Sequence, residues 1–413
     1  MKYYGFYNLI FGLLFFATTA CNKNNNKLEN GIWRAVLKTE SGKEIPFNFE
    51  VNEIDNKPLI TIINGNEKLK VEEIIDKGDS LQIIMPLFDS EIHVKKQNNK
   101  LSGIWIKHLG DKKDVYMPFE AVLGDNFRFT NTSSASVNNI AGRWETVFIS
   151  EENDTTIAVG EFTQNGKKVL GTFLTTTGDY RFLEGEVIEN KLSLSCFDGS
   201  HAFLFTADIK ENQLENGRFY SGATYSENWS AVRNENAKLP DAYSLTFLKP
   251  EYKKLAFNFP DLTNKRISLE DENFKGKVVI VQIMGSWCPN CMDETAFLSD
   301  YYKENKNKGV EIIALAYERS SDFTKAAINV ERLKKRFNAE YTFLIAGTND
   351  KTKVNESLPM ISKFLAFPTS IIIDRNGAVN TIYTGFSGPG TGIHYEEFVK
   401  EFNSRMNKLI ENK

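Results

Sequence analysis

The sequence predicts a multidomain fold in which two antiparallel β modules, either small barrels or sandwiches, precede a C-terminal α/β domain. Three observations predict this organisation. Strand-like stretches punctuated by Asn, Asp and Gly fill residues 31–233, and no long helical period interrupts them. These stretches form two halves that match each other. After residue 250, apolar strands alternate with helices, as in a sheet with helices on its faces.

Length and charge agree with several folded domains and exclude some partners. The chain has 413 residues, of which 41% are hydrophobic and 25% are charged. It carries 50 Lys and Arg against 54 Asp and Glu, which gives a net charge of -4. Because there is no basic excess to neutralise phosphates, we expect no nucleic-acid partner. Four His and four Cys leave little for metal clusters, so we expect neither a metal nor a cofactor.

The pattern of the N-terminal residues indicates an export signal. Residues 1–20 contain Lys2, an apolar stretch and then small residues, which are the three parts of a secretory signal peptide. The small residues that lead to Cys21 resemble a bacterial lipoprotein processing site, which implies a lipid-anchored Cys21 in the cell envelope, facing the periplasm. The polar residues 21–30 would form a tether. Cleavage after Ala20 without a lipid, and an uncleaved membrane helix, are the alternatives.

The two β halves are related as a repeat. Three anchors recur at a step of about 110 residues, which makes chance matching improbable. The matched pairs are Gly31-Ile32-Trp33 with Gly142-Arg143-Trp144, Phe88-Asp89-Ser90 with Phe197-Asp198-Gly199-Ser200, and Phe119-Glu120-Ala121-Val122 with Trp229-Ser230-Ala231-Val232. We therefore predict β module 1 over residues 31–123 and its repeat, β module 2, over residues 142–233.

We predict structural roles in the cores for three individual residues of the β modules. Trp33 and Trp144 open the two modules, and we expect them to plug the cores. Their Gly-x-Trp setting resembles the first strand of lipocalin-like barrels, so a ligand-binding barrel is the alternative. Cys196 aligns with the apolar Leu87 of the other copy, which predicts a small buried hydrophobe rather than a third redox thiol. No arrangement of His, Ser or carboxylates in these modules indicates catalysis.

The C-terminal domain is predicted over residues 250–413. Its apolar and amphipathic runs are fit for buried strands and for helices that cover them. The expected elements are strands at 277–284, 309–318, 341–347 and 370–379, helices at 290–305, 321–337 and 394–411, and a short helix near 357–365.

The chemistry is concentrated in Cys288 and Cys291, at the junction of the first strand and the first helix of this domain. A helix N-terminus offers unpaired N–H groups and a positive dipole end, which stabilise a thiolate on the first cysteine. The second cysteine lies one turn inside, near enough to attack a mixed disulfide. A structural disulfide and half of a zinc site are alternatives, but the zinc site needs a second ligand pair, which the sequence lacks.

The motifs around these cysteines carry a resemblance to a known family. They are the run VVIVQIMGS-Trp287-Cys288-Pro289-Asn290-Cys291, the later Phe367-Pro368-Thr369 before SIIIDRNGAV, and the lead-in FPDLTNKRISLEDENFKGKVVIVQ. Together they resemble the thioredoxin fold and, more closely, the TlpA/ResA-like family of envelope thiol-disulfide oxidoreductases. The resemblance covers residues 250–411 and leaves out the β modules.

The resemblance implies a mechanism and its residues. The Cys288 thiolate would attack a substrate disulfide, and Cys291 would then release the reduced product, leaving a Cys288–Cys291 redox disulfide. Pro368 would follow a cis peptide bond, and Trp287, Phe367 and Pro368 would contact the substrate. The implied partners are disulfide-containing envelope proteins and a membrane electron donor, because the compartment is oxidising.

The family also points to an acid. Thioredoxin has a buried Asp six residues before the first cysteine, where this chain has Gln282, which cannot take a proton. ResA-like proteins place a Glu three residues after the second cysteine, and here that residue is Glu294. One helical turn puts it on the face of Cys291, and partial burial would raise its pKa so that it exchanges protons with the thiols. The alternative is a solvated glutamate that only favours the helix dipole.

Two further functions compete with this reading. A thiol peroxidase shares the fold but needs Thr or Ser three residues before its reactive cysteine and Pro seven before it, where this chain has Gly285 and Val281. A ligand- or partner-binding lipoprotein, dominated by the β modules, is the other competitor. We expect the modules to dock substrate proteins or to mediate self-association.

Overall fold

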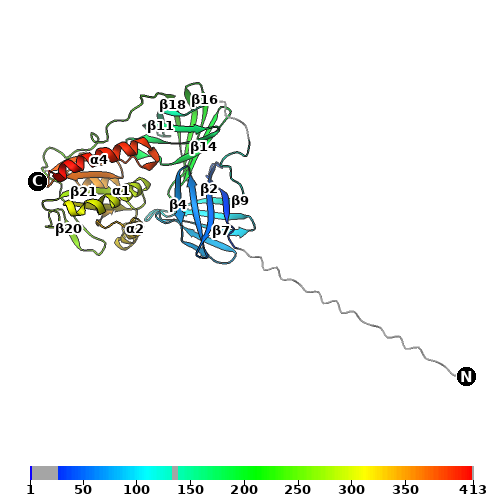
Figure 1. The fold of residues 1–413 in the computed structure, drawn as a ribbon, viewed down its shortest axis with the longest axis horizontal. Helices are drawn as coiled ribbons and strands as arrows, with labels where there is room; N and C mark the ends of the chain where they lie inside the picture. The colour runs from blue at the N-terminus through cyan, green and yellow to red at the C-terminus, as the bar shows by residue number, and fades with distance from the viewer. Residues whose placement is uncertain (2–26, 133–137, 412–413) are drawn as a thin grey trace.

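The computed structural model describes Met1, residues 27–132 and residues 138–411. Figure 1 shows a β-rich half, blue to cyan in its first part and green in its second, beside an α/β domain coloured from yellow to red. The predicted signal segment and Cys21 lie outside the described residues. Within the described ranges, no helix has the length and apolar composition that a membrane crossing requires.

The first part of the chain folds into an antiparallel sheet, which we call β module 1. Its strands are β1 (Gly31–Lys38), β2 (Glu44–Ile54), β3 (Lys57–Asn64), β4 (Glu67–Val71), β5 (Ile74–Asp76), β6 (Ser80–Ile84), β7 (Ser90–Gln97), β8 (Lys100–Lys107) and β9 (Val115–Leu123). Their spatial order is β4-β3-β2-β1-β9-β8-β7-β6-β5. Buried and less buried residues alternate along β7 because one face of the sheet packs inward. The inward residues include Trp33, Phe47 and Trp105.

The next part, β module 2, follows the same up-and-down strand order. Its strands are β10 (Gly142–Ile149), β11 (Thr155–Asn165), β12 (Lys168–Thr175), β13 (Gly178–Asp179), β14 (Leu183–Ile188), β15 (Lys191–Phe197), β16 (Ala202–Lys210), β17 (Gln213–Ser221) and β18 (Tyr225–Arg233). The order is β11-β10-β18-β17-β16-β15-β14-β12-β13, and β12 also pairs with β11. That extra pairing closes β module 2 into a barrel, so the predicted small β barrel is confirmed for this copy.

The opening tryptophans have equivalent places in both modules. Trp33 and Trp144 are buried, and each indole N–H donates to a carbonyl oxygen four residues earlier, that of Glu29 at 3.1 Å and that of Ile140 at 2.9 Å. Cys196 is a free thiol buried in the core of β module 2. The prediction that these three side chains fill cores is therefore confirmed.

The C-terminal part is an α/β domain of the predicted thioredoxin-like type. Its sheet has the order β23-β22-β21-β24-β25, with β21 parallel to β22 and antiparallel to β24. The elements are β19 (Asn258–Pro260), β20 (Arg266–Ser268), β21 (Val278–Met284), α1 (Pro289–Asn305), η1 (Lys306–Lys308), β22 (Val310–Glu318), α2 (Phe323–Arg336), β23 (Thr342–Thr348), α3 (Lys351–Ser357), β24 (Thr369–Ile373), β25 (Val379–Thr384), η2 (Pro389–Thr391) and α4 (Ile393–Glu411).

The central strand β21 is buried on both faces, as its continuous apolar run predicts. On one face, Val278 and Ile280 pack with residues of α1, α2 and α4. On the other face, Val279 and Val281 pack with Val354 of α3 and the segment that follows it. Helices therefore pack on the sheet, and the carboxyl end of β21 leads to the start of α1.

The short helix near 357–365 was predicted wrongly. The helix in this region, α3, ends at Ser357, and residues 358–365 are irregular. It begins earlier because the Asp350 side chain caps it, accepting a hydrogen bond from the Thr352 N–H at 2.8 Å. It ends there because Leu358 precedes Pro359, and a residue before proline disfavours helical backbone angles.

Candidate active site

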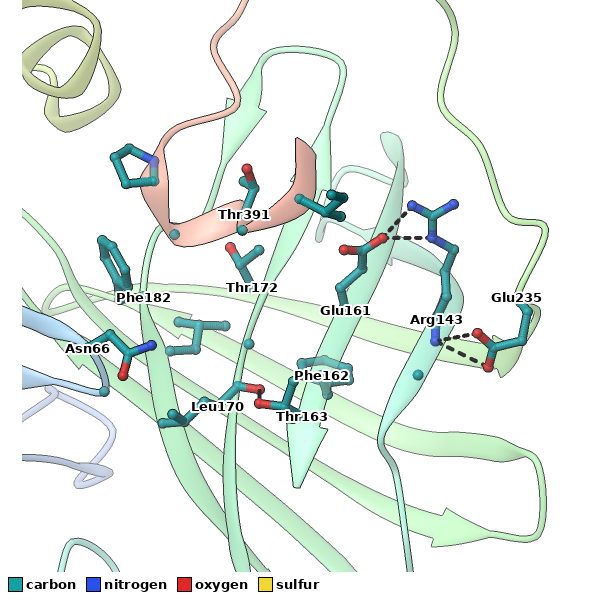
Figure 2. Close-up of a pocket in the computed structure, with 18 residues that line it drawn as sticks. Asn66, Arg143, Glu161, Phe162, Thr163, Leu170, Thr172, Phe182, Glu235 and Thr391 are labelled. Atoms are coloured by element: carbon teal, nitrogen blue, oxygen red, sulfur yellow. Dashed lines mark hydrogen bonds and ion pairs between the residues drawn. The ribbon is translucent and has the colours of Figure 1, made fainter. Parts of the chain in front are cut away.

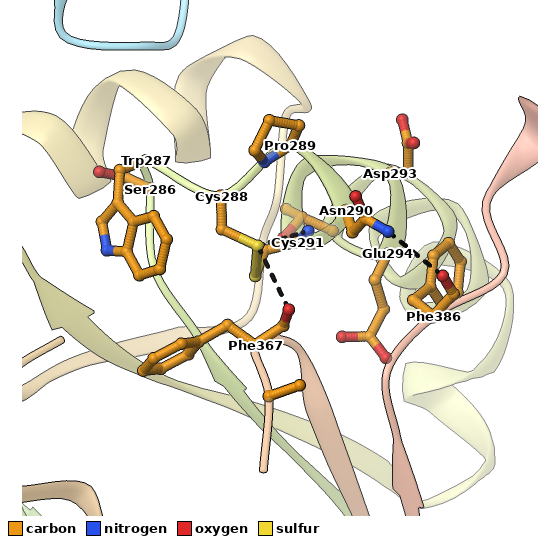
Figure 3. Close-up of a disulfide and its surroundings, with 12 residues drawn as sticks. Ser286, Trp287, Cys288, Pro289, Asn290, Cys291, Asp293, Glu294, Phe367 and Phe386 are labelled. Carbon is orange, nitrogen blue, oxygen red and sulfur yellow. Dashed lines mark hydrogen bonds between the residues drawn. A yellow bond between two sulfur atoms is a disulfide. The ribbon is translucent and has the colours of Figure 1, made fainter. Parts of the chain in front are cut away.

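The two cysteines lie at the junction between the end of β21 and the start of α1. Cys288 is the N-cap residue of α1, Pro289 is its first helical residue, and Cys291 lies in the first turn. Cys288 and Cys291 form a disulfide with their Cα atoms 5.2 Å apart (Figure 3). The Cys291 N–H points at the Cys288 sulfur from 3.1 Å. This backbone donor and the helix dipole both favour negative charge on the Cys288 sulfur.

The predicted substrate loop lies against the disulfide. The Phe367–Pro368 peptide bond is cis, as expected. The Phe367 carbonyl oxygen lies 3.6 Å from the Cys288 sulfur, and the Phe367 ring meets the Trp287 ring edge to face at 5.2 Å (Figure 3). The Trp287 indole N–H donates to the Tyr317 carbonyl oxygen at 2.9 Å. The structure thus brings Trp287, Phe367 and Pro368 to the cysteines.

Glu294 is more deeply buried than the sequence suggested. Its side chain lies inside the domain with 1% exposure, and it accepts hydrogen bonds from Gln282 Nε2 at 2.9 Å and from Ser370 Oγ at 2.8 Å. Burial raises the pKa of Glu294 to about 7, although the two hydrogen bonds act in the opposite direction. The carboxyl group therefore changes protonation near neutral pH, and Gln282 is its hydrogen-bond donor.

A second buried carboxyl group, Glu318, was not anticipated. It ends β22 and accepts hydrogen bonds from the Ser286 N–H at 2.8 Å and the Ser286 hydroxyl at 2.7 Å. Burial raises the pKa of Glu318. The next residue, Arg319, stacks over the Trp287 ring at 5.4 Å and donates to the His108 carbonyl oxygen of β module 1 at 3.1 Å. Glu318 thus anchors the loop before Cys288, and Arg319 links that loop to the β region.

The β modules pack against the region around the disulfide. Leu87 and Phe88 of β module 1 belong to the same apolar cluster as Cys288 and Cys291. The Ser200 hydroxyl of β module 2 donates weakly to the Trp287 carbonyl oxygen at 3.4 Å. Within this surrounding Cys288 is 5% exposed. The sequence marked these loops as repeat anchors, but it carried no signal for what they contact.

β module 2 also holds the two residues between the cysteines. Arg181 Nη1 donates to the Pro289 carbonyl oxygen at 3.1 Å, and Asn290 Nδ2 donates to the Asp179 carbonyl oxygen at 3.2 Å. A carboxylate oxygen of Asp179 accepts from the Gly388 N–H at 2.7 Å, beyond β25. These contacts join segments far apart in sequence, so no local pattern could have predicted them.

A cavity of about 570 Å3 lies elsewhere, between β module 2 and the η2 turn. Figure 2 shows Arg143 and Glu161 paired with each other along its wall, with Thr391 and Phe182 on other sides. Neither cysteine lines this cavity. The charged residues on its wall already have partners, so the cavity adds nothing to the redox chemistry.

Comparisons with known proteins find relatives of this chain. The Redoxin family model matches residues 236–395. The chain is 33% identical over 155 residues to the thiol-disulfide oxidoreductase ResA of Bacillus thuringiensis subsp. konkukian, covering 37% of this chain and 79% of that protein. It is 28% identical over 129 residues to ResA of Bacillus subtilis, covering 31% and 64%. The solved thioredoxin domain of a thiol-disulfide oxidoreductase from Bacteroides vulgatus aligns with 37% of this chain and 99% of that chain, at 24% identity and a TM-score of 0.28.

Proposed function

Because the chain belongs to the family of the ResA thiol-disulfide oxidoreductases, we propose that it reduces protein disulfides in the cell envelope through Cys288 and Cys291. The observation that carries the proposal is the placement of this pair. The Cys288 sulfur lies at the N-terminus of α1 and 3.6 Å from the Phe367 carbonyl oxygen of the cis-proline loop. A thiolate is stabilised there, and a substrate segment lying along Phe367 would place its disulfide next to it.

The reaction proceeds by two exchanges of sulfur. The Cys288 thiolate attacks one sulfur of the substrate disulfide, and the other substrate sulfur leaves as a thiolate. Cys291 then loses its proton and attacks the Cys288 sulfur, which expels the remaining substrate thiolate. Two electrons pass from the protein dithiol to the substrate, and the protein is left with the Cys288–Cys291 disulfide that the structure contains.

Glu294 is the proposed acceptor of the Cys291 proton. It lies three positions after Cys291 in the first turns of α1, so both side chains leave the same side of the helix. A carboxyl group with a pKa of about 7 can take up a thiol proton and give it back at neutral pH. Trp287, Phe367 and Pro368 are the proposed substrate-contacting residues.

The catalytic cycle needs electrons from outside the chain. The disulfide left after each turnover must be reduced again, and we assign this step to a membrane electron donor. The sequence before residue 27 supports an envelope location, because Cys21 follows an export signal and would carry a lipid anchor. Disulfide-containing proteins are abundant in such compartments, so they are the proposed substrates.

The β modules are the proposed selectors of substrate. Their loops pack into the apolar cluster that contains the cysteines and bond to the Trp287 carbonyl oxygen, and Cys288 is only 5% exposed. A substrate must fit between these loops and the cis-proline loop, or displace them. Family membership gives no support to the peroxidase and ligand-binding alternatives.

Single-turnover reduction of a disulfide-linked peptide by the reduced protein tests the proposal. Cys288→Ser should abolish the reaction, and Cys291→Ser should accumulate a mixed disulfide at Cys288, because the resolving thiol is missing. Cys196→Ala is the matched control, since Cys196 is buried in the core of β module 2 and should not take part. Reduction at the normal rate by Cys288→Ser would refute the proposal.

A further inference from the structure

Arg181 of β module 2 has an unusual backbone for a residue with a long side chain. It lies between β13 and β14 with a φ of 57°, in the left-handed region. This conformation is routine only for glycine and, as single residues, for some Asn and Asp. The Arg181 N–H donates to a carboxylate oxygen of Asp179 at 2.6 Å, which stabilises the turn. From this turn the Arg181 side chain reaches α1.

The guanidinium group joins all three parts of the molecule. It is 1% exposed and pairs with Glu67 of β module 1, Asp198 of β module 2 and Asp293 of α1. Burial alone would lower the pKa of Arg181, but these carboxylates raise it well above its usual value. Arg181 therefore remains a buried cation at neutral pH.

The same side chain reaches into the redox motif. Arg181 Nη1 donates to the carbonyl oxygen of Pro289, which lies within the ring that the Cys288–Cys291 disulfide closes. Asp179 holds the side chain of Asn290, the other residue inside that ring. Both residues between the cysteines are thus fixed by one short segment of β module 2.

The charge of Arg181 lies beside the helix terminus that supports the Cys288 thiolate. Asp293, its partner on α1, is two residues after Cys291. Because a cation near a thiolate stabilises it, Arg181 reinforces the effect of the α1 dipole, whereas Asp293 opposes it. A more stable thiolate makes the reduced form of the pair more favourable.

We propose that Arg181 is a positioning residue of the redox centre: by holding the Pro289 carbonyl oxygen and the Asp293 carboxylate, it fixes the turn between the cysteines and sets how readily their disulfide is reduced. The inference rests on the redox role proposed above for Cys288 and Cys291. It makes β module 2 part of the machinery that determines the reduction potential, although its residues do not react.

The test compares Arg181→Met with Asp293→Asn in the full chain. Each purified protein is equilibrated with glutathione buffers at pH 7, and the oxidised fraction of the Cys288–Cys291 pair is measured by thiol trapping. Arg181→Met should shift the equilibrium at least tenfold toward the disulfide, which corresponds to about 30 mV for this two-electron couple. Asp293→Asn should shift the equilibrium in the opposite direction, because it removes one of the carboxylates that neutralise the charge of Arg181.

A second readout separates electrostatics from a loss of packing. In the Cys291→Ser background, the alkylation rate of Cys288 is followed against pH. Arg181→Met should move the apparent pKa of Cys288 upward, and Arg181→Lys, which keeps the charge, should restore part of the difference.

Two other arginines are matched controls. Arg128 is as deeply buried and bonds to Ile63, Asn64 and Ser195 of the β modules. Arg143 links β module 2 to the C-terminal domain, where its Nη2 lies 2.8 Å from His394 Nε2. If Arg181 only holds the parts together, Arg128→Met and Arg143→Met should change the equilibrium as much as Arg181→Met does.

The outcomes separate the two proposals. If Arg181→Met and both control variants shift the dithiol–disulfide equilibrium by amounts within twofold of one another, the proposed role of Arg181 is wrong. The proposed redox function would then still stand. If Arg181→Met does not fold, Asp293→Asn decides, and an unchanged equilibrium in that variant overturns the role. A wild-type protein that exchanges no electrons with glutathione would overturn both proposals.

Discussion

Phe88 and Phe197 occupy matching positions in the two copies of the repeat, yet they insert into different cores. Phe197 of β module 2 is fully buried in the core of β module 1, stacked on Phe47 with ring centroids 4.3 Å apart. Phe88 of β module 1 packs instead into the cluster of the C-terminal domain that contains Cys288. Each copy therefore uses this loop to dock on another part of the molecule, β module 2 on β module 1 and β module 1 on the C-terminal domain.

The polar residues of the two loops complete the contact. The Ser90 hydroxyl donates to the Gly199 carbonyl oxygen at 2.5 Å, so the loops touch each other. Ser200 then reaches the Trp287 carbonyl oxygen at the redox centre. The loop of β module 2 thus inserts its aromatic ring into the β region, whereas the loop of β module 1 inserts its apolar side chains into the cluster that contains the cysteines.

The largest expected effect is on stability, from Phe197→Ala. Removing this ring leaves a cavity between Phe47 and Trp105, and we expect a loss of about 3–5 kcal/mol in the free energy of unfolding. Urea unfolding followed by tryptophan fluorescence measures this. A loss below about 1 kcal/mol would mean that the ring does not hold the two modules together.

The next effect separates the two loops by function. Phe88→Ala removes a large side chain from the apolar cluster that contains Cys288, and we expect it to accelerate alkylation of Cys288 about tenfold in the Cys291→Ser background, since each 1.36 kcal/mol is tenfold in rate. Phe197→Ala is the matched control and should leave this rate within twofold. Equal acceleration in both variants would show that the loops do not differ in this way.

The smallest expected effect concerns pH. Because burial raises the pKa of Glu294 from 4.5 to about 7, the folded protein binds this proton more tightly than the unfolded chain does. This contribution to the free energy of unfolding therefore falls as pH rises from about 4.5 to about 7. Glu294→Gln should remove that slope, measured by urea unfolding at pH 5 and pH 8.

The same substitution should also shift the pH profile of thiol reactivity. An unchanged profile in Glu294→Gln would remove Glu294 from the mechanism.

The sequence could predict what depends on local pattern. The apolar run before Cys288 predicts a buried strand, and Pro289 indicates the start of a helix. The family motif implies the cis peptide bond before Pro368. The contact of Arg181 with Pro289 and the packing of Phe88 in the C-terminal cluster could not be predicted, because each joins segments more than one hundred positions apart and nothing in the adjacent sequence marks the partner.

Measuring the reduction potential of the Cys288–Cys291 pair is the most direct test of the proposal that this protein reduces its substrates. Trp287 adjoins the disulfide, so its fluorescence can report the redox state against defined dithiol buffers. We expect a value near that of thioredoxin, about -270 mV, which suits a protein that reduces its substrates. A value near that of DsbA, about -120 mV, would make the protein an oxidant and contradict the proposed direction of electron flow.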